Sequence, residues 1–318
     1  MSARRRLVPL CLICGIWIGC NAENGERDGS VPEVDAAKVD AADGSSSRDM
    51  APDALVAPTG PARLTTIIDR ITLPLSGEQY AMDYDGTGEK NQMGVIVGAM
   101  DQFGNDDFQK WANENIKNGT TLSLIEVFAD SIVDDAAALA RFSAGKDLDS
   151  DPSDNFTGSE AFGIAEQDPA ALVVKGAISG ARLTTIPSNA TMVNLDGTMP
   201  YVVTRIRMMG DLSDSHQAIT GGQLNSVIPQ SELDAKFFPL LAKGITDFIN
   251  DPNSDPLAVS FYKNMDTNKD GVVDVDELKK DKLVGQFIAP DVDTDGDGKP
   301  DAMSMGYGFT AVPCKIKR

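Results

Sequence analysis

The feature that most constrains this chain is a run of twelve residues near its C-terminus, from Asp266 to Glu277, in which oxygen-bearing side chains recur at alternate positions. A hard cation such as Ca²⁺ binds about six to eight oxygens, and this spacing offers side-chain oxygens at positions 1, 3 and 5, a backbone carbonyl at position 7 and a two-oxygen carboxylate at position 12. Gly271 stands at position 6, where the chain must turn sharply and glycine meets little steric resistance. The run therefore predicts a calcium loop. Its expected ligands are Asp266, Asn268, Asp270, Val272 through its carbonyl, Asp274 through a water molecule, and Glu277.

This loop resembles that of the EF-hand family over its full length, which implies a helix on either side. Residues 256–265 suit the entering helix, because Pro256 fits the first helical position and Asp255 fits the N-cap before it. Residues 278–288 suit the leaving helix, and the resemblance implies that Val273 packs inward behind the ion. The alternative is an acidic surface turn that binds no metal. Occupation of every ligand position at once favours the calcium loop.

A second acidic loop, residues 293–301, follows closely. Its positions 1, 3, 5, 6 and 9 match a calcium loop, but position 12 is Ser304, and Pro300 lacks the backbone N–H that a paired EF-hand uses between its loops. The loop is instead similar to the nine-residue calcium loops of integrin-type propellers and thrombospondin type 3 repeats, which implies that the carboxylate at position 9 closes the site. Its expected metal-site residues are Asp293, Asp295, Asp297, Lys299 and Asp301. A solvated acidic turn is the alternative.

Two weaker copies of this pattern lie upstream, at residues 83–91 and 147–155. The first keeps only two carboxylates, Asp83 and Asp85, among its ligand positions. The second has Pro152 where the turning glycine belongs, and proline cannot adopt the left-handed backbone that glycine allows. We expect both to be acidic loops without a bound ion.

The N-terminus predicts export from the cell. Arginines precede an apolar stretch, Leu7–Gly19, that is too short to span a membrane. The run Trp17-Ile18-Gly19-Cys20 resembles the lipobox of bacterial lipoproteins, which implies that residues 1–19 are a signal peptide and that Cys20 is acylated. Residues 20–60 are rich in Ala, Asp, Ser, Gly and Pro and predict a disordered acidic tether. We therefore expect lipid anchoring to the bacterial cell envelope, at the outer membrane or the periplasmic face. The alternative is ordinary cleavage after Ala22.

The composition is strongly acidic, with 28 Lys and Arg against 48 Asp and Glu, a net charge of −20 and a pI near 4.3. This balance argues against nucleic acid or an anionic membrane surface as a partner and suits cations. Two of the four cysteines leave with the signal peptide and Cys20 is expected to be acylated, so Cys314 is left alone and no disulfide framework is expected. The expected partners are calcium ions and, through the lipid anchor, the membrane; the sequence identifies no protein or glycan partner.

The remaining residues predict an α+β fold. We expect a predominantly antiparallel β body with appended amphipathic helices over 61–252, and an EF-hand helix-loop-helix, the second calcium loop and a closing strand over 253–318. Strands are expected where β-branched residues gather, and helices where apolar residues recur three or four apart. The expected strands are 63–73, 122–128, 172–174, 181–186, 201–208 and 305–312, and the expected helices are 93–103, 108–116 closed by Asn118-Gly119, and 231–249 with a bend at Pro239.

The sequence offers little from which to build an active site. His216 is the single histidine, so His/Cys zinc sites are excluded; no G-x-S-x-G motif accompanies it, and an exposed loop histidine is expected. Acidic residues are plentiful, so a carboxylate pair for glycoside hydrolysis stays an alternative.

The layout as a whole resembles that of EF-hand-containing bacterial lipoproteins, which implies a cell-envelope location and nothing about activity. The sequence thus predicts a secreted, calcium-binding surface lipoprotein in which Ca²⁺ stabilises a binding or structural module. A secreted hydrolase with structural calcium is the alternative. A calcium sensor is disfavoured, because sensors expose a groove between paired EF-hands and only one such loop is expected here.

Overall fold

The computed structural model describes residues 61–102, 107–165, 172–193, 200–213 and 217–318. The expected signal peptide, Cys20 and the tether up to residue 60 lie outside the described residues, and so does His216. Within the described ranges a membrane-spanning helix is absent.

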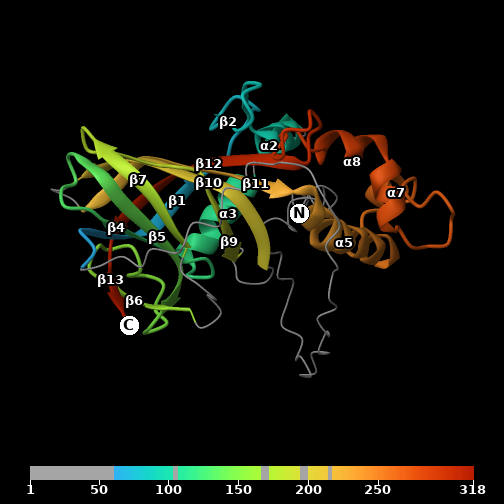
Figure 1. Cartoon of the computed structure of the whole chain (residues 1–318). Helices are drawn as coiled ribbons and strands as arrows, with labels where there is room; N and C mark the ends of the chain where they lie inside the picture. The colour runs from blue at the N-terminus through green and yellow to red at the C-terminus, as the bar shows by residue number, and fades with distance from the viewer. Residues whose placement is uncertain (1–60, 103–106, 166–171, 194–199, 214–216) are drawn as a thin grey trace, which may run out of the picture.

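Eight antiparallel strands close into a barrel (Figure 1). The ring closes because β5 pairs with β7 as well as with β4, while β1 near the start of the described chain pairs with β12 near its end. Around the ring the strands are β1 (Leu64–Thr72), β4 (Ser123–Phe128), β5 (Asp135–Asp147), β7 (Leu172–Ser179), β8 (Arg182–Thr185), β10 (Pro200–Ser213), β11 (Ala218–Pro229) and β12 (Ala302–Pro313). The expected α+β fold was therefore wrong, since the structure is mostly β and its sheet is closed.

Side chains on alternate residues fill the barrel and also build a smaller core outside it. On β4, Ile125 and Val127 join the main core, whereas Leu124 points the other way and packs with Phe162 and Ile67. This follows from the two-residue period of a strand, which sends neighbours to opposite faces. The outer core is covered by β6 (Ala161–Ile164) and β13 (Lys315–Lys317), which pair in parallel. The buried Cys314 lies in this outer core and forms no disulfide.

Three further short strands lie beside the ring. β9 (Ser188–Val193) pairs with β10, and β2 (Met82–Asp83) pairs with β3 (Glu89–Lys90) in a separate two-stranded ribbon.

The segment that carries β2 and β3 covers the outer face of β12, as Figure 1 shows. The Asn91 side chain donates to the Gly306 carbonyl (2.9 Å) and accepts from the Gly306 N–H (3.1 Å). At Gly308 a Cβ would lie 2.5 Å from the Tyr80 ring, so only glycine allows this approach. The contact places loop 83–91 beside the start of β12, where loop 293–301 ends.

The helices expected from apolar periodicity are present as α2 (Gln92–Gln102) and α3 (Asp107–Lys117). α3 lies against β1, where the amides of Gln109 and Asn113 bond to the backbone of Ile71 and Leu73. The expected strands at 63–73 and 122–128 are likewise confirmed as β1 and β4, within a residue or two of the expected ends.

The chain between β11 and β12 is helical and leaves one end of the barrel (Figure 1). A π-helical turn, η1 (Leu233–Phe237), lies shortly before Pro239, the residue at which a bend was expected. The expected N-cap at Asp255 is also confirmed, because its side chain accepts from the N–H groups of Leu257 and Ala258. The helices of this segment are α4 (Gln230–Glu232), α5 (Phe238–Asn250), α6 (Pro256–Tyr262), α7 (Val275–Lys280) and α8 (Lys282–Phe287).

The expected C-terminal EF-hand helix-loop-helix was wrong. The helix before loop 266–277 has seven residues and the helix after it has six, because the backbone becomes extended at Asp281 (ψ 128°) and ends α7. The unit is also not appended to the end of the body. After it, the chain returns as β12 and fills the place between β1 and β11.

Candidate metal-binding loops

The four acidic loops share one backbone turn. In each loop the N–H at position 5 donates to the side-chain oxygen at position 3, and the residue at position 4 is left-handed. The bonds run from Thr87 to Asp85 (3.0 Å), Asp151 to Asp149 (3.0 Å), Asp270 to Asn268 (2.8 Å) and Asp297 to Asp295 (3.0 Å). The left-handed residues are Gly86, Ser150, Lys269 and Gly296, with φ of 78°, 64°, 62° and 81°. An aspartate or asparagine at position 3 thus fixes the turn in every loop, and the loops differ in what surrounds it.

Loop 293–301 gathers three carboxylates. Ligand oxygens of Asp293, Asp295 and Asp297 all lie within 4.8 Å of one another. Asp293 also accepts from the N–H groups of Gly296 and Gly298, both at 2.7 Å, so its position is fixed by the turn. Like charges this close repel, and a bound cation would relieve the repulsion. Carboxylate oxygens are hard donors, so the group suits Ca²⁺.

The expected closing residue of this loop, Asp301, does not belong to that group. Its carboxylate accepts from the N–H and the hydroxyl of Thr294, each at 2.7 Å. The ends of the loop are joined by an antiparallel bridge between Val292 and Ala302, and the Asp301 carbonyl accepts from the N–H of Gln230. Lys299, expected at position 7, donates its N–H to Asp297 (2.8 Å). The base of the loop is therefore closed by protein hydrogen bonds.

Loop 266–277 has the same kind of closure at its last residue. Glu277 is 5% exposed, and its carboxylate accepts from the N–H and hydroxyl of Thr267 and from the N–H groups of Asn268 and Asp274. Burial opposes ionisation of Glu277, but these hydrogen bonds outweigh it and hold its pKa below the usual range. The loop is thus held together from its second residue to its last.

Two other expected ligands of loop 266–277, Asp266 and Asp274, accept hydrogen bonds from backbone N–H groups of the same loop. Asp266 accepts from the N–H groups of Asp270 (3.2 Å) and Gly271 (2.9 Å). Asp274 caps α7 by accepting from the Glu277 N–H (2.8 Å), and Val272, expected to offer its carbonyl, is half exposed. Among the described residues, the groups of three or more metal-ligating side chains within 4.8 Å include none from this loop. The carboxylates here stand further apart than in loop 293–301.

Loop 83–91 already holds a positive charge of its own. The ammonium of Lys90 lies 2.8 Å from Asp85 Oδ2 and donates to the carbonyl of Asp291 (2.6 Å). Burial opposes ionisation of Asp85, but the bonds from Lys90 and Thr87 hold its pKa well below the usual range. The ammonium thus neutralises a carboxylate that a metal ion would otherwise need.

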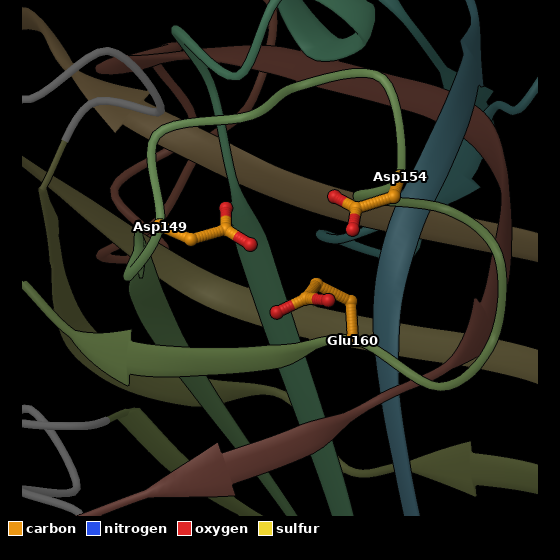
Figure 2. Close-up of side chains that lie close together, drawn as sticks. All are labelled: Asp149, Asp154 and Glu160. Atoms are coloured by element: carbon orange, nitrogen blue, oxygen red, sulfur yellow. The ribbon is translucent and has the colours of Figure 1, made fainter.

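Loop 147–155 contributes to a group that the spacing did not predict. Oxygens of Asp149, Asp154 and Glu160 lie within 4.8 Å of one another, and Figure 2 shows the three carboxylates pointing toward a common centre. Glu160 stands immediately before β6, outside the loop pattern. Burial, and repulsion from Asp149, Glu160 and Asp151, raise the pKa of Asp154. The expected position-9 residue, Asn155, is instead buried beside Gly119.

Comparison of the chain with protein-family models, with curated proteins and with solved structures gave no match. The functional argument therefore rests on the geometry of these loops.

Proposed function

We propose that this protein is an exported calcium-binding protein in which Ca²⁺ stabilises the barrel, with loop 293–301 as one site and loop 266–277 as the other. The observation that carries the proposal is the gathering of Asp293, Asp295 and Asp297 within 4.8 Å. At about 4 Å each pair of carboxylates repels by about 1 to 4 kcal/mol, depending on the effective dielectric. A divalent cation between them converts that cost into attraction.

The position of loop 293–301 supports a stabilising role. The loop leads directly into β12, which is buried over most of its length and joins β1 to β11. An ion that orders the loop therefore also orders the start of a strand on which closure of the barrel depends.

Loop 266–277 supports the proposal through its ligand spacing and its closed form. Val273 is buried and its N–H bonds to Thr246 of α5 (2.9 Å), so the loop is fixed to the helical segment. Extracellular calcium modules bind with dissociation constants of about 10⁻⁴ to 10⁻³ M, and we expect that range here. A bidentate Glu277 would favour Ca²⁺ over the smaller, octahedral Mg²⁺.

Calorimetric titration of the purified protein with CaCl₂ tests the proposal. Asp297→Asn should remove the heat of one site and Glu277→Gln that of the other. Asp276→Asn is the matched control, because this exposed acid at position 11 of the loop has no ligand role and its loss changes the net charge equally. Calcium heats that are the same in wild type and both site variants would refute the proposal.

Anchoring through Cys20 is the second part of the proposal, and it rests on the signal-like N-terminus. Cys20→Ala should move the protein from the membrane fraction to soluble or unprocessed form. A wild-type protein that is already soluble and begins at Glu23 would refute the anchor.

The hydrolase alternative has one specific place to be tested. Asp154, with its raised pKa, lies beside Asp149 and Glu160, and a general acid needs such a carboxyl next to an ionised one. Turnover of a glycan panel that is lost in Asp154→Asn would favour the hydrolase over the purely structural calcium protein.

A further inference from the structure

Loop 83–91 touches the proposed calcium loop through its own acidic side chain. Asp85 Oδ2 accepts a hydrogen bond from the backbone N–H of Asp293 (3.1 Å), the first residue of loop 293–301. The Asp85 side chain is only 5% exposed, and its other oxygen accepts from the N–H (3.0 Å) and hydroxyl (2.6 Å) of Thr87. The carboxylate is therefore directed at the neighbouring loop and fully occupied by protein donors.

Lys90 strengthens this contact from the other side. Its ammonium donates both to Asp85 Oδ2 and to the carbonyl of Asp291, two residues before the calcium loop begins. The Asp291 carboxylate in turn accepts from the N–H (2.7 Å) and hydroxyl of Ser304, beyond the end of the loop. Asp291 before loop 293–301 and Ser304 after it thus belong to one hydrogen-bond network with Lys90 and Asp85.

Arg205 joins the same two loops at their second residues. Its guanidinium donates through Nη1 to the Tyr84 carbonyl and through Nη2 to the Thr294 carbonyl (2.6 Å). Arg205 has left-handed backbone (φ 53°) where the pairing of β10 with β11 shifts register. The two loops are therefore connected at equivalent positions by a single side chain.

We propose that Asp85 is a positioning residue for calcium at loop 293–301: it fixes the backbone of Asp293 so that the three carboxylates of the loop stand ready for the ion. This inference rests on the proposed function of that loop. Groups outside the ligand shell commonly set metal affinity, because they hold a ligand in the geometry that the ion requires. Here that group is Asp85 of loop 83–91, a weaker copy of the calcium-loop pattern in which the Lys90 ammonium pairs with the carboxylate.

The experiment uses the full chain with Asp266→Asn and Asp270→Asn, so that loop 293–301 is the site under study. Calcium titration should show Asp85→Ala binding about 10- to 100-fold more weakly than its parent. Asp83→Ala is the matched control: Asp83 lies in the same loop with the same charge, is exposed, and accepts from the N–H of Gly86 in its own loop. Its affinity should stay within about twofold of the parent.

Two further readings separate positioning from general destabilisation. Hydrogen exchange in EDTA should become faster at the Asp293 amide of Asp85→Ala, and by more than at amides elsewhere in the barrel, although loss of the ion pair with Lys90 also lowers the melting temperature. Asp85→Asn keeps an oxygen that can accept from the Asp293 N–H, so it should recover part of the affinity.

Equal calcium affinities in Asp85→Ala and Asp83→Ala would overturn the positioning role and leave the calcium site standing. Loss of affinity without faster exchange at Asp293 would also overturn it. If the parent binds no calcium, or if Asp297→Asn does not abolish its binding, the proposed function of the loop fails and this inference falls with it.

Discussion

The backbone N–H and the hydroxyl of Thr294 both donate to the carboxylate of Asp301, joining the second residue of loop 293–301 to its last. Thr267 bonds in the same way to Glu277 in loop 266–277, at 2.8 and 2.9 Å. Two loops of different length are thus closed by the same pair of groups, a threonine after the first aspartate and the final carboxylate. The closure is made by protein hydrogen bonds, and under the proposed function it would hold each loop in shape for an ion.

Thr294→Val should lower the stability of the calcium-free protein, because the hydroxyl bond to Asp301 is lost while the backbone bond remains. A hydrogen bond to a charged group contributes about 1.5 to 3 kcal/mol, and partial exposure places this one at the lower end. For a body of this size that corresponds to a fall in melting temperature of about 3 to 6 °C in calorimetry with EDTA. Thr294→Ser keeps the hydroxyl and is the control; equal losses in both variants would show that the methyl group matters instead.

Removal of calcium should destabilise the C-terminal part of the barrel without unfolding it. At a calcium concentration tenfold above the dissociation constant, each independent site adds about 1.4 kcal/mol by mass action. Chelation should therefore lower the melting temperature by several degrees while the β signal in circular dichroism stays. Hydrogen exchange should rise chiefly between residues 255 and 318. An unchanged melting temperature together with a new surface that binds an apolar dye would instead support a calcium sensor.

Local patterns in the sequence were enough to predict the elements whose identity is decided locally. β1, β4, α2 and α3 follow from β-branched runs and apolar periodicity, and the N-cap at Asp255 follows from the residues around it. Closure of the barrel could not be predicted in this way. It depends on pairings such as Ile71 with Phe309, whose partners are far apart in the chain and carry no mutual signal in one sequence.

Two barrel strands were missed because their residues have low strand propensity. β5 contains a run of alanines, which have low strand propensity, yet Ala138 and Ala140 are fully buried in the core. β11 contains Gly221-Gly222, which indicates a turn in sequence but here lies inside the ladder. In both strands tertiary packing, and not local preference, decides the conformation.

The residues of the candidate sites likewise fall into those that local spacing predicts and those that it does not. Spacing alone predicted the residues that the structure gathers as Asp293, Asp295 and Asp297. Glu160 was missed because it lies outside the spacing of its acidic loop. Lys90 was missed because it belongs to loop 83–91 but pairs with Asp85 in place of a metal ion. Thr267 and Thr294 could have been found, since a hydroxyl residue follows the first aspartate in both loops.

Gly222→Ala should destabilise the barrel, because a Cβ at this position would lie 2.6 Å from the ring of Phe309 on the neighbouring strand. Overpacking of this kind costs about 1 to 3 kcal/mol. Denaturant unfolding measures the loss, and Phe309→Leu in the same chain is the test of mechanism. The double variant should lose less than the sum of the two single variants; strict additivity would show that the ring is not what excludes the side chain.

Asp154→Asn should stabilise the calcium-free protein near neutral pH. The folded state raises the pKa of Asp154 through burial and through repulsion by Asp149, Glu160 and Asp151, so the ionised carboxylate is less favourable in the folded chain than in the unfolded one. A raised pKa means that the contribution of Asp154 to stability is greatest below its unfolded pKa and is lost as pH rises through the folded pKa. The melting temperature of Asp154→Asn should therefore exceed that of wild type at pH 7, and the difference should shrink as pH falls toward 4.

Asp151→Asn provides a control with the opposite sign in the same loop. Hydrogen bonds from the hydroxyl and N–H of Ser153 lower the pKa of Asp151, so its ionised form is favoured by folding and its removal should not stabilise the protein. Melting curves of both variants across pH 4 to 8 in EDTA separate repulsion within the group from a general effect of lowering the negative charge. If the two substitutions raise the melting temperature equally, the net charge of −20 is responsible and the close approach of Asp154 to Asp149 and Glu160 is not.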